Sequence, residues 1–164
     1  MKIIVAVYSD WGIGSGGNQT IVLPEDRRFF SNLTAGGVVI AGRKTFDEIC
    51  KPLPDRKNII LTRDRGYTAA GAVTVHSFGE ALNEIAVDDP DKIFVIGGGE
   101  IYRLFLPMCS YAYVTKIDTA PLSDTFFPNL DVMQDWSLES RSEVQNSECG
   151  IWYSFNIYKN VTNQ

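Results

Sequence analysis

Short runs of consecutive apolar residues recur along most of the chain. Runs of this length, rich in β-branched side chains, are typical of strands buried in a parallel sheet. They predict six strands, at residues 2–7, 38–41, 58–62, 73–75, 92–96 and 111–117.

Helical patterns fill most of the gaps between these runs. Pro24 can open a first helix, because its missing N–H has no intrahelical partner at that position. Capping boxes, in which Thr45 pairs with Glu48 and Ser77 with Glu80, predict two more helix starts. A fourth helix is expected after the glycines at 97–99, ending near residue 106.

The pattern changes beyond residue 117, where no helix is expected. Residues 136–144 and 151–159 instead predict two strands that pair antiparallel at one edge. Repeated strand–helix units followed by terminal strands predict an α/β fold: one domain over residues 1–164, with a central, mixed, mostly parallel sheet flanked by helices and an antiparallel C-terminal edge.

Composition narrows the function classes. Hydrophobic content is 45% and the net charge is −5, so a nucleic-acid partner, which requires a basic surface, is not expected. The first apolar run is too short for a signal sequence or a membrane span. The single histidine leaves no multi-histidine metal site. Cys50, Cys109 and Cys149 are widely spaced, which is typical of reduced thiols in a cytoplasmic protein.

One acid of the first predicted helix shares a face with apolar residues. Asp26, Phe30 and Leu33 stand at helical spacing, whereas Glu25 does not share that side. A buried carboxylate is costly without a partner, so Asp26 is a candidate functional acid. A helix-start acid that caps backbone amides is the alternative.

Glycines follow the first strand at Gly12, Gly14 and Gly17. They match the dinucleotide-binding spacing formally, but that motif needs a helix to begin at its glycines, and the next helix begins only at Pro24. A flexible loop over residues 12–18 that closes on a ligand is the better interpretation, with a plain surface loop as the alternative.

Cations and glycines cluster at the predicted carboxyl ends of the strands, where ligands bind in open α/β sheets. Arg43 and Lys44 precede a helix start, an arrangement suited to a phosphate. Arg63 follows the next strand. The glycines at 97–99 let the backbone approach a ligand closely, although no Gly-Lys-Ser/Thr follows, so this is not a Walker loop.

The chain resembles the dihydrofolate reductase family. The resemblance rests on motifs in the family's order and spacing: Leu23-Pro24-x-Asp26 with Phe30, Gly42-Arg43-x-Thr45-Phe46, Pro52-Leu53-Pro54-x-Arg56-x-Asn58, Ile96-Gly97-Gly98-Gly99-x-Ile101-Tyr102, Tyr113-x-Thr115 and Asp124-Thr125-x-Phe127-Pro128. Together they cover nearly the whole chain.

The resemblance implies a folate site. Asp26 would bind the amino edge of the pterin with Thr115 bridged to it, and Arg56 would pair with the glutamate α-carboxylate. Asp26 and Thr115 are thus the implied catalytic pair. The implied substrate-binding residues are Ile4, Ala6, Asp26, Arg27, Phe30, Ile49, Lys51, Leu53, Arg56 and Thr115.

It also implies an NADPH site, with a cis bond between Gly97 and Gly98. Arg43 and Arg63 would meet the 2′-phosphate. The implied cofactor-binding residues are Ala6, Ile13, Gly14, Gly17, Asn18, Gly42, Arg43, Lys44, Thr45, Leu61, Thr62, Arg63, His76, Ile96, Gly97, Gly98, Gly99, Glu100, Ile101 and Tyr102.

The chain departs from the family pattern at Thr20-Ile21 and at Arg27. Thr20-Ile21 replaces the usual Pro-Trp, which puts the placement of a water near the pterin in doubt. Arg27 replaces an aliphatic residue, which affects expected contacts with the folate tail. His76 matches a place near the adenosine, where a solvated loop histidine is the alternative.

The resemblance therefore implies a cytoplasmic, monomeric enzyme that uses NADPH to reduce 7,8-dihydrofolate to tetrahydrofolate. A related reductase of riboflavin synthesis is a second interpretation, but it lacks the helix start that carries Asp26. A non-catalytic folate- or nucleotide-binding module is the third.

Overall fold

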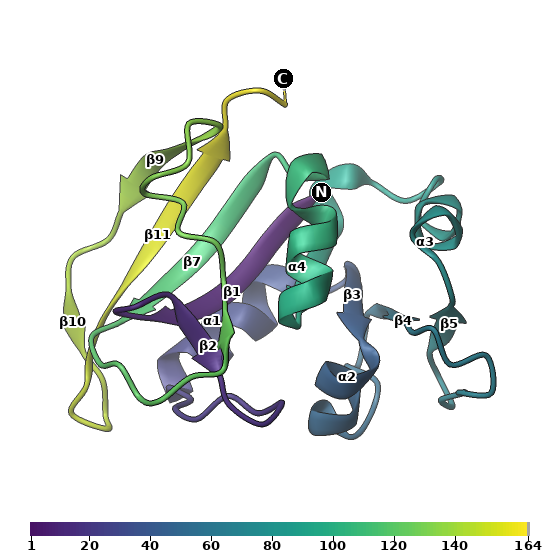
Figure 1. Ribbon diagram of the computed structural model, residues 1–164, viewed down its shortest axis with the longest axis horizontal. Helices are drawn as coiled ribbons and strands as arrows, with labels where there is room; N and C mark the ends of the chain where they lie inside the picture. Colours follow the sequence, from purple (N-terminus) through teal and green to yellow (C-terminus); the bar gives the residue numbers. More distant parts are fainter. Residues whose placement is uncertain (164) are drawn as a thin grey trace.

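The computed structural model describes residues 1–163 and contains a nine-stranded mixed sheet with helices on both faces (Figure 1). Its strand order is β10-β11-β7-β1-β6-β3-β4-β5, with β9 also paired to β11. The strands are β1 (Lys2–Tyr8), β3 (Val38–Gly42), β4 (Lys57–Leu61), β5 (Val73–Val75), β6 (Ile93–Gly97), β7 (Tyr111–Ile117), β9 (Trp136–Arg141), β10 (Gln145–Asn146) and β11 (Trp152–Asn160).

Parallel pairing joins β7, β1, β6, β3, β4 and β5, and β11 runs antiparallel to β7, β9 and β10. The six predicted strands of the parallel part and the antiparallel edge are thus confirmed. The edge differs in one detail, since the predicted strand at 136–144 ends at Arg141 and a separate short strand, β10, follows.

Four helices follow the predicted order: α1 (Pro24–Thr34), α2 (Arg43–Ile49), α3 (Phe78–Glu84) and α4 (Gly99–Phe105). In Figure 1, α4 lies in front of the sheet and α1 behind it. Short 3-10 turns occupy Pro90–Lys92 and Leu106–Met108. Over residues 1–163, no helix is long and apolar enough to cross a membrane.

Alternate residues of the inner strands serve two cores. Ile3, Val5 and Val7 of β1 pack with the main core, which includes side chains of α3 and α4. Ile4 packs on the other side with Phe30 and Leu33 of α1. Because side chains of a strand alternate between faces, β1 packs against α3 and α4 on one face of the sheet and against α1 on the other.

The two predicted capping boxes differ in outcome. Ser77 accepts the backbone N–H of Glu80 at 3.1 Å, as predicted, while the Glu80 carboxylate accepts the N–H of His76. The prediction of a capping box between Thr45 and Glu48 is wrong. Gly42 is the N-cap of α2, so the helix already begins at Arg43, and the first turn contains both predicted cations.

The glycine-rich segment is more ordered than the predicted loop. Gly12–Gly14 forms β2, which pairs antiparallel with β8 (Thr125–Phe126) in a separate two-stranded ribbon. Gly16 and Gly17 have positive φ values of 62° and 85°, a conformation that favours glycine, and a short turn continues to Asn18.

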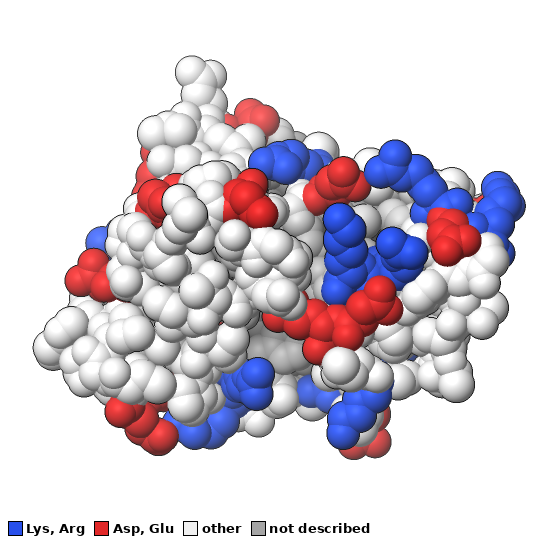
Figure 2. Space-filling view, turned by 60° about the horizontal axis from the view of Figure 1, so that its bottom comes forward, with Lys and Arg blue, Asp and Glu red and all other residues white. Residues whose placement is uncertain are grey.

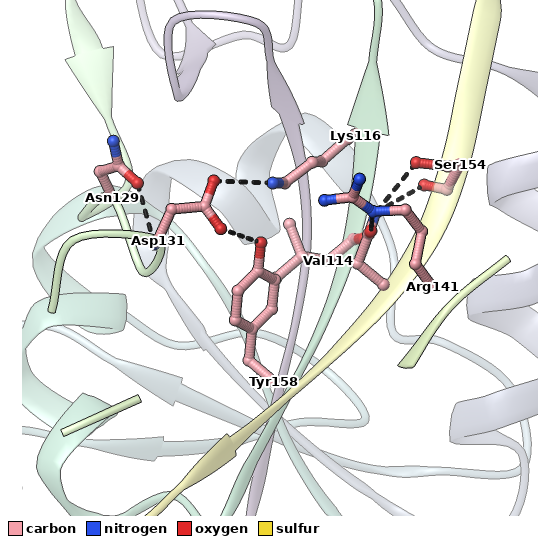
Figure 3. A network of polar contacts seen from close by, with 8 residues as sticks. Val114, Lys116, Asn129, Asp131, Arg141, Ser154 and Tyr158 are labelled. Carbon is pink, nitrogen blue, oxygen red and sulfur yellow. Dashed lines mark hydrogen bonds and ion pairs between the residues drawn. The ribbon is translucent and has the colours of Figure 1, made fainter. Parts of the chain in front are cut away.

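A polar cluster anchors the chain just before this ribbon. Lys116 and Asp131 form an ion pair at 2.9 Å, and Tyr158 donates its hydroxyl to Asp131 at 2.7 Å (Figure 3). The Lys116 ammonium lies 5.0 Å from the ring centre of Trp11, which also packs against the ring of Phe127. Trp11, with a φ of 65°, is therefore held on several sides.

Candidate active site

Asp26 lies in the first turn of α1 and meets Thr115 of β7. The Thr115 hydroxyl donates to Oδ1 of Asp26 at 2.6 Å, and Thr115 is 1% exposed. Burial raises the pKa of Asp26, while the hydrogen bond from Thr115 opposes that shift. The helical periodicity predicted this inward direction for Asp26. Its neighbour Glu25 instead accepts hydrogen bonds from Ser147 and the N–H of Glu148.

Apolar residues proposed for substrate binding gather beside Asp26. Ile4, Phe30 and Leu53 belong to one cluster with Ile96, between α1 and the sheet. Ile49 ends α2 and is half-buried. Arg27 and Lys51, the two charged residues that the resemblance also implied for substrate binding, lie apart from these apolar residues. Both are exposed, and neither belongs to the cluster.

Arg56 is held by its own chain. Its Nε donates to Thr34 Oγ1 at 2.9 Å, Nη1 to the carbonyl of Pro54 at 2.6 Å, and Nη2 to the carbonyl of Ser31 at 2.7 Å. A guanidinium has five N–H donors, so one remains on each terminal nitrogen. Those two donors suit a carboxylate, and the other three fix the plane of the group.

A cleft of about 1470 Å³ crosses the carboxyl ends of β1, β3, β4 and β6. All twenty residues predicted for cofactor binding line it, from Ala6 to Tyr102. Of the residues predicted for substrate binding, only Ala6 does so. Basic and acidic side chains are interspersed on this face of the molecule, with no single basic patch (Figure 2).

The end of β6 borders both the cleft and the apolar cluster, because Ile96 belongs to each of them. The bond between Gly97 and Gly98 is cis, as the resemblance implied. The Tyr102 hydroxyl hydrogen-bonds to the carbonyls of Ile4 and Ile96, both at 2.9 Å. Burial, with the nearby charge of Asp26, raises the pKa of Tyr102, so the hydroxyl remains protonated and can donate.

Two arginines at one end of the cleft already have acidic partners. Arg43 Nη1 lies 3.7 Å from Oδ2 of Asp64, and Arg63 Nη2 lies 3.2 Å from Oε2 of Glu100. Lys44 lines the same cleft but makes no ion pair within 4.0 Å among the described residues. His76 lines the cleft as well, with Nδ1 3.0 Å from the carbonyl of Thr62.

Acids hold the glycine-rich segment at the mouth of the cleft. Asp124 accepts the N–H of Gly16 at 2.9 Å and donates its own N–H to the carbonyl of Gly14 at 3.0 Å. The bond from Gly16 lowers the pKa of Asp124. Glu48 accepts the N–H of Gln19 at 3.3 Å, so acids hold both the middle of the segment and the residue that follows it.

Several lining residues were missed by the sequence analysis: Val5, Gly16, Gln19, Glu48, Asp64, Ser77, Phe78, Arg103, Leu104, Asp124, Thr125 and Phe126. Arg103 of α4 donates to the carbonyl of Phe126 at 3.0 Å, which links α4 to the β2–β8 ribbon. The predicted strand ends could have suggested Asp64 and Ser77, since each lies two residues beyond a predicted strand. Arg103 gives no comparable signal in the sequence.

Known proteins resemble this chain in both sequence and structure. A family model described as dihydrofolate reductase matches residues 1–160. The dihydrofolate reductase of Neisseria gonorrhoeae is 37% identical over 159 residues, covering 96% of each chain. The Haemophilus influenzae protein of the same name is 40% identical over 138 residues, covering 84% of each chain.

A solved structure has the same architecture. Dihydrofolate reductase from Enterococcus faecalis, complexed with NADP(H) and RAB-propyl, superposes with a TM-score of 0.84 at 30% identity, over 97% of this chain and 95% of that one. Agreement of sequence and fold over nearly the full length, together with the inward-facing Asp26 and the cleft beside it, leads to one conclusion. The chain belongs to the dihydrofolate reductase family.

Proposed function

We propose that this protein catalyses the NADPH-dependent reduction of 7,8-dihydrofolate to 5,6,7,8-tetrahydrofolate. The observation that carries the proposal is the hydrogen bond from the buried Thr115 of β7 to Asp26 of α1, with the large cleft only one strand away. A carboxylate in that setting binds a planar ring with adjacent N–H donors, as the pterin has.

The cleft fits NADPH by its shape and its donors. A Cβ atom at Gly99 would come 2.7 Å from Thr125, so a side chain there would force a neighbour to shift, and one at Gly98 would make a tight contact of 3.3 Å with Thr45. Arg43 and Arg63 would hold the 2′-phosphate, and Lys44 and Thr45 the pyrophosphate. When bound, NADPH supplies the hydride that the reaction requires.

Asp26 would anchor the pterin through its amino group and ring N–H. Reduction leaves a ring nitrogen, N5, that must gain a proton, and an acid engaged at the amino edge does not reach it directly. The negative charge of Asp26 favours protonation of N5 from water instead. Thr115 keeps one carboxylate oxygen oriented, so the other is free for the substrate.

The remaining folate contacts are assigned to the residues on either side of the pterin. Phe30, Ile49 and Leu53 would hold the aromatic rings, and Arg56 would take the α-carboxylate of the tail with its two remaining donors. Arg27 and Lys51, both exposed, would act on the solvated end of the tail through charge alone.

A spectrophotometric assay of NADPH consumption with dihydrofolate tests this function. We expect turnover with dihydrofolate, and none with the aminopyrimidine substrate of the related reductase of riboflavin synthesis. Binding of folate and NADPH without turnover would instead identify a non-catalytic module. We also propose that the enzyme acts as a monomer in the cytoplasm, which analytical ultracentrifugation and cell fractionation would test.

A further inference from the structure

The cofactor cleft is lined by acidic as well as basic side chains, although its proposed ligand is a phosphorylated dinucleotide. Its lining contains the basic side chains of Arg43, Lys44, Arg63 and Arg103 and the acidic side chains of Glu48, Asp64, Glu100 and Asp124. The acids therefore match the bases in number.

Two of these acids are paired with the two arginines assigned to the 2′-phosphate. Asp64 follows Arg63 in the chain but pairs with Arg43, and Glu100, in the first turn of α4, reaches across to Arg63. A phosphate that binds both arginines must either displace these carboxylates or share the guanidinium groups with them. It must also approach two negative charges that lie within about 4 Å of its intended partners.

We propose that Glu100 and Asp64 are specificity-determining residues, which weaken binding of NADPH by competing with its 2′-phosphate for Arg63 and Arg43. This inference rests on the proposed function. NADH carries a hydroxyl in place of that phosphate, so its affinity depends far less on either acid. The two carboxylates therefore narrow the preference between the two cofactors.

The expected effect is modest because both ion pairs are exposed to solvent. The Arg63 and Glu100 side chains are 89% and 83% exposed, and Arg43 and Asp64 are 42% and 54% exposed. Water and salt weaken such pairs, so removing one acid should raise the affinity for NADPH by about two- to fivefold. The effect should shrink as ionic strength rises.

The variants Glu100→Gln and Asp64→Asn remove charge with little change of shape. Asn at position 64 keeps the Oδ1 acceptor that receives the N–H of Gly66 at 2.9 Å, so the turn is preserved. Glu139→Gln, on exposed strand β9 at the opposite edge of the sheet, is the matched control for the loss of one negative charge.

Isothermal titration calorimetry with NADPH and with NADH measures the result directly. We expect Glu100→Gln and Asp64→Asn each to raise the ratio of NADPH to NADH affinity, and Glu139→Gln to leave it unchanged. An unchanged or lower ratio in both cleft variants, or an equal rise in the control, would overturn the inference. If the native protein binds neither dinucleotide, the proposed function itself fails.

A double-mutant cycle tests whether Glu100 acts through Arg63. In an Arg63→Ala background, the gain in NADPH affinity from Glu100→Gln should fall to less than half of its value in the native background. A gain of undiminished size would show that Glu100 repels the phosphate without competing for Arg63, and would contradict the competition proposed here.

Discussion

Thr115 donates its hydroxyl to Oδ1 of Asp26 across 2.6 Å, although 89 positions separate the two residues in the chain. The bond joins the central sheet to the first turn of α1. Because a hydrogen bond to a carboxylate stabilises its charged form, Thr115 partly offsets the cost of burying Asp26.

Thr115→Val should therefore raise the pKa of Asp26 further. The substitution keeps the shape of the side chain but leaves Oδ1 without its donor. Loss of a hydrogen bond to a charged group should weaken folate binding by roughly tenfold or more. Fluorescence titration with folate and infrared spectroscopy of the Asp26 carboxyl would measure both effects. An unchanged pKa would mean that the bond has no influence on the acid.

Asp26→Asn should lower the rate of hydride transfer at neutral pH by about 10²-fold or more, the scale of a lost electrostatic or general-acid contribution. The rate should recover partly in acid, where N5 is protonated more readily, and NADPH affinity should change little. Pre-steady-state kinetics across a pH series would show this. Near-native turnover of the variant would show that Asp26 is only a helix-start acid with no role in the reaction.

Glu25→Gln is the matched control for that experiment. It removes the same charge one position earlier, from a side chain that bonds to Ser147 and Glu148 and not to Thr115. Its turnover should stay near the native value, which separates a specific role of Asp26 from a general loss of charge in α1.

The same acid should cost the protein stability. The pKa of Asp26 is higher in the folded protein than its ordinary value of 3.8, so the folded state holds its proton more tightly. The free energy of unfolding therefore falls as pH rises from near 3.8 through the folded-state pKa. Asparagine does not titrate and escapes this loss.

Asp26→Asn should consequently raise the Tm of the ligand-free protein at pH 7, by roughly 2–4 °C if about 1 kcal/mol is recovered. In strong acid, where the native acid is also neutral, the gain should vanish. Calorimetry at both pH values would measure it. A variant less stable than the native protein at pH 7 would contradict this account.

Arg43 and Arg63 should together set the preference for NADPH. In the native protein we expect NADPH to be used more efficiently than NADH. Replacing both residues with alanine should narrow the difference, because each charge-assisted contact contributes roughly 1.5–3 kcal/mol. Comparison of kcat/KM for the two cofactors is the measurement, and equal efficiency in the native enzyme would sink the prediction.

The segment from Gly12 to Asn18 should become more protected when ligands bind. Gly16 and Gly17 are exposed and have open space where a side chain would stand, so little packing restrains them. Hydrogen exchange at these two residues should slow in the complex with NADPH and folate together. Exchange at Gly12, which is paired with β8, should change less.

Local signals in the sequence predicted the inner strands and the direction of Asp26, because both follow from short-range periodicity. Asp26 and Phe30 are one turn apart, and the helix geometry alone places them on one face. The β1 run is a dense set of apolar residues with few alternatives to a buried strand. Predictions of this kind need no knowledge of distant partners.

Features that depend on distant contacts escaped that reasoning. Glu48 looked like a capping residue, but it binds Gln19 from 29 positions away. Gly14 looked like part of an open loop, but it pairs with Thr125 on a strand of only two residues. Both errors arise where a long-range contact outweighs a local preference.

Trp11 fixes the point at which the glycine-rich segment leaves the body of the protein. Its ring is held by Lys116 and Phe127, and its carbonyl accepts the N–H of Phe127 at 2.9 Å. Any movement of the glycine-rich segment must therefore begin after Trp11, because Trp11 itself is fixed by these contacts. We therefore expect substitution of Lys116, on the face of the sheet opposite Asp26, to change the rates of ligand binding and release and to leave the rate of hydride transfer unchanged.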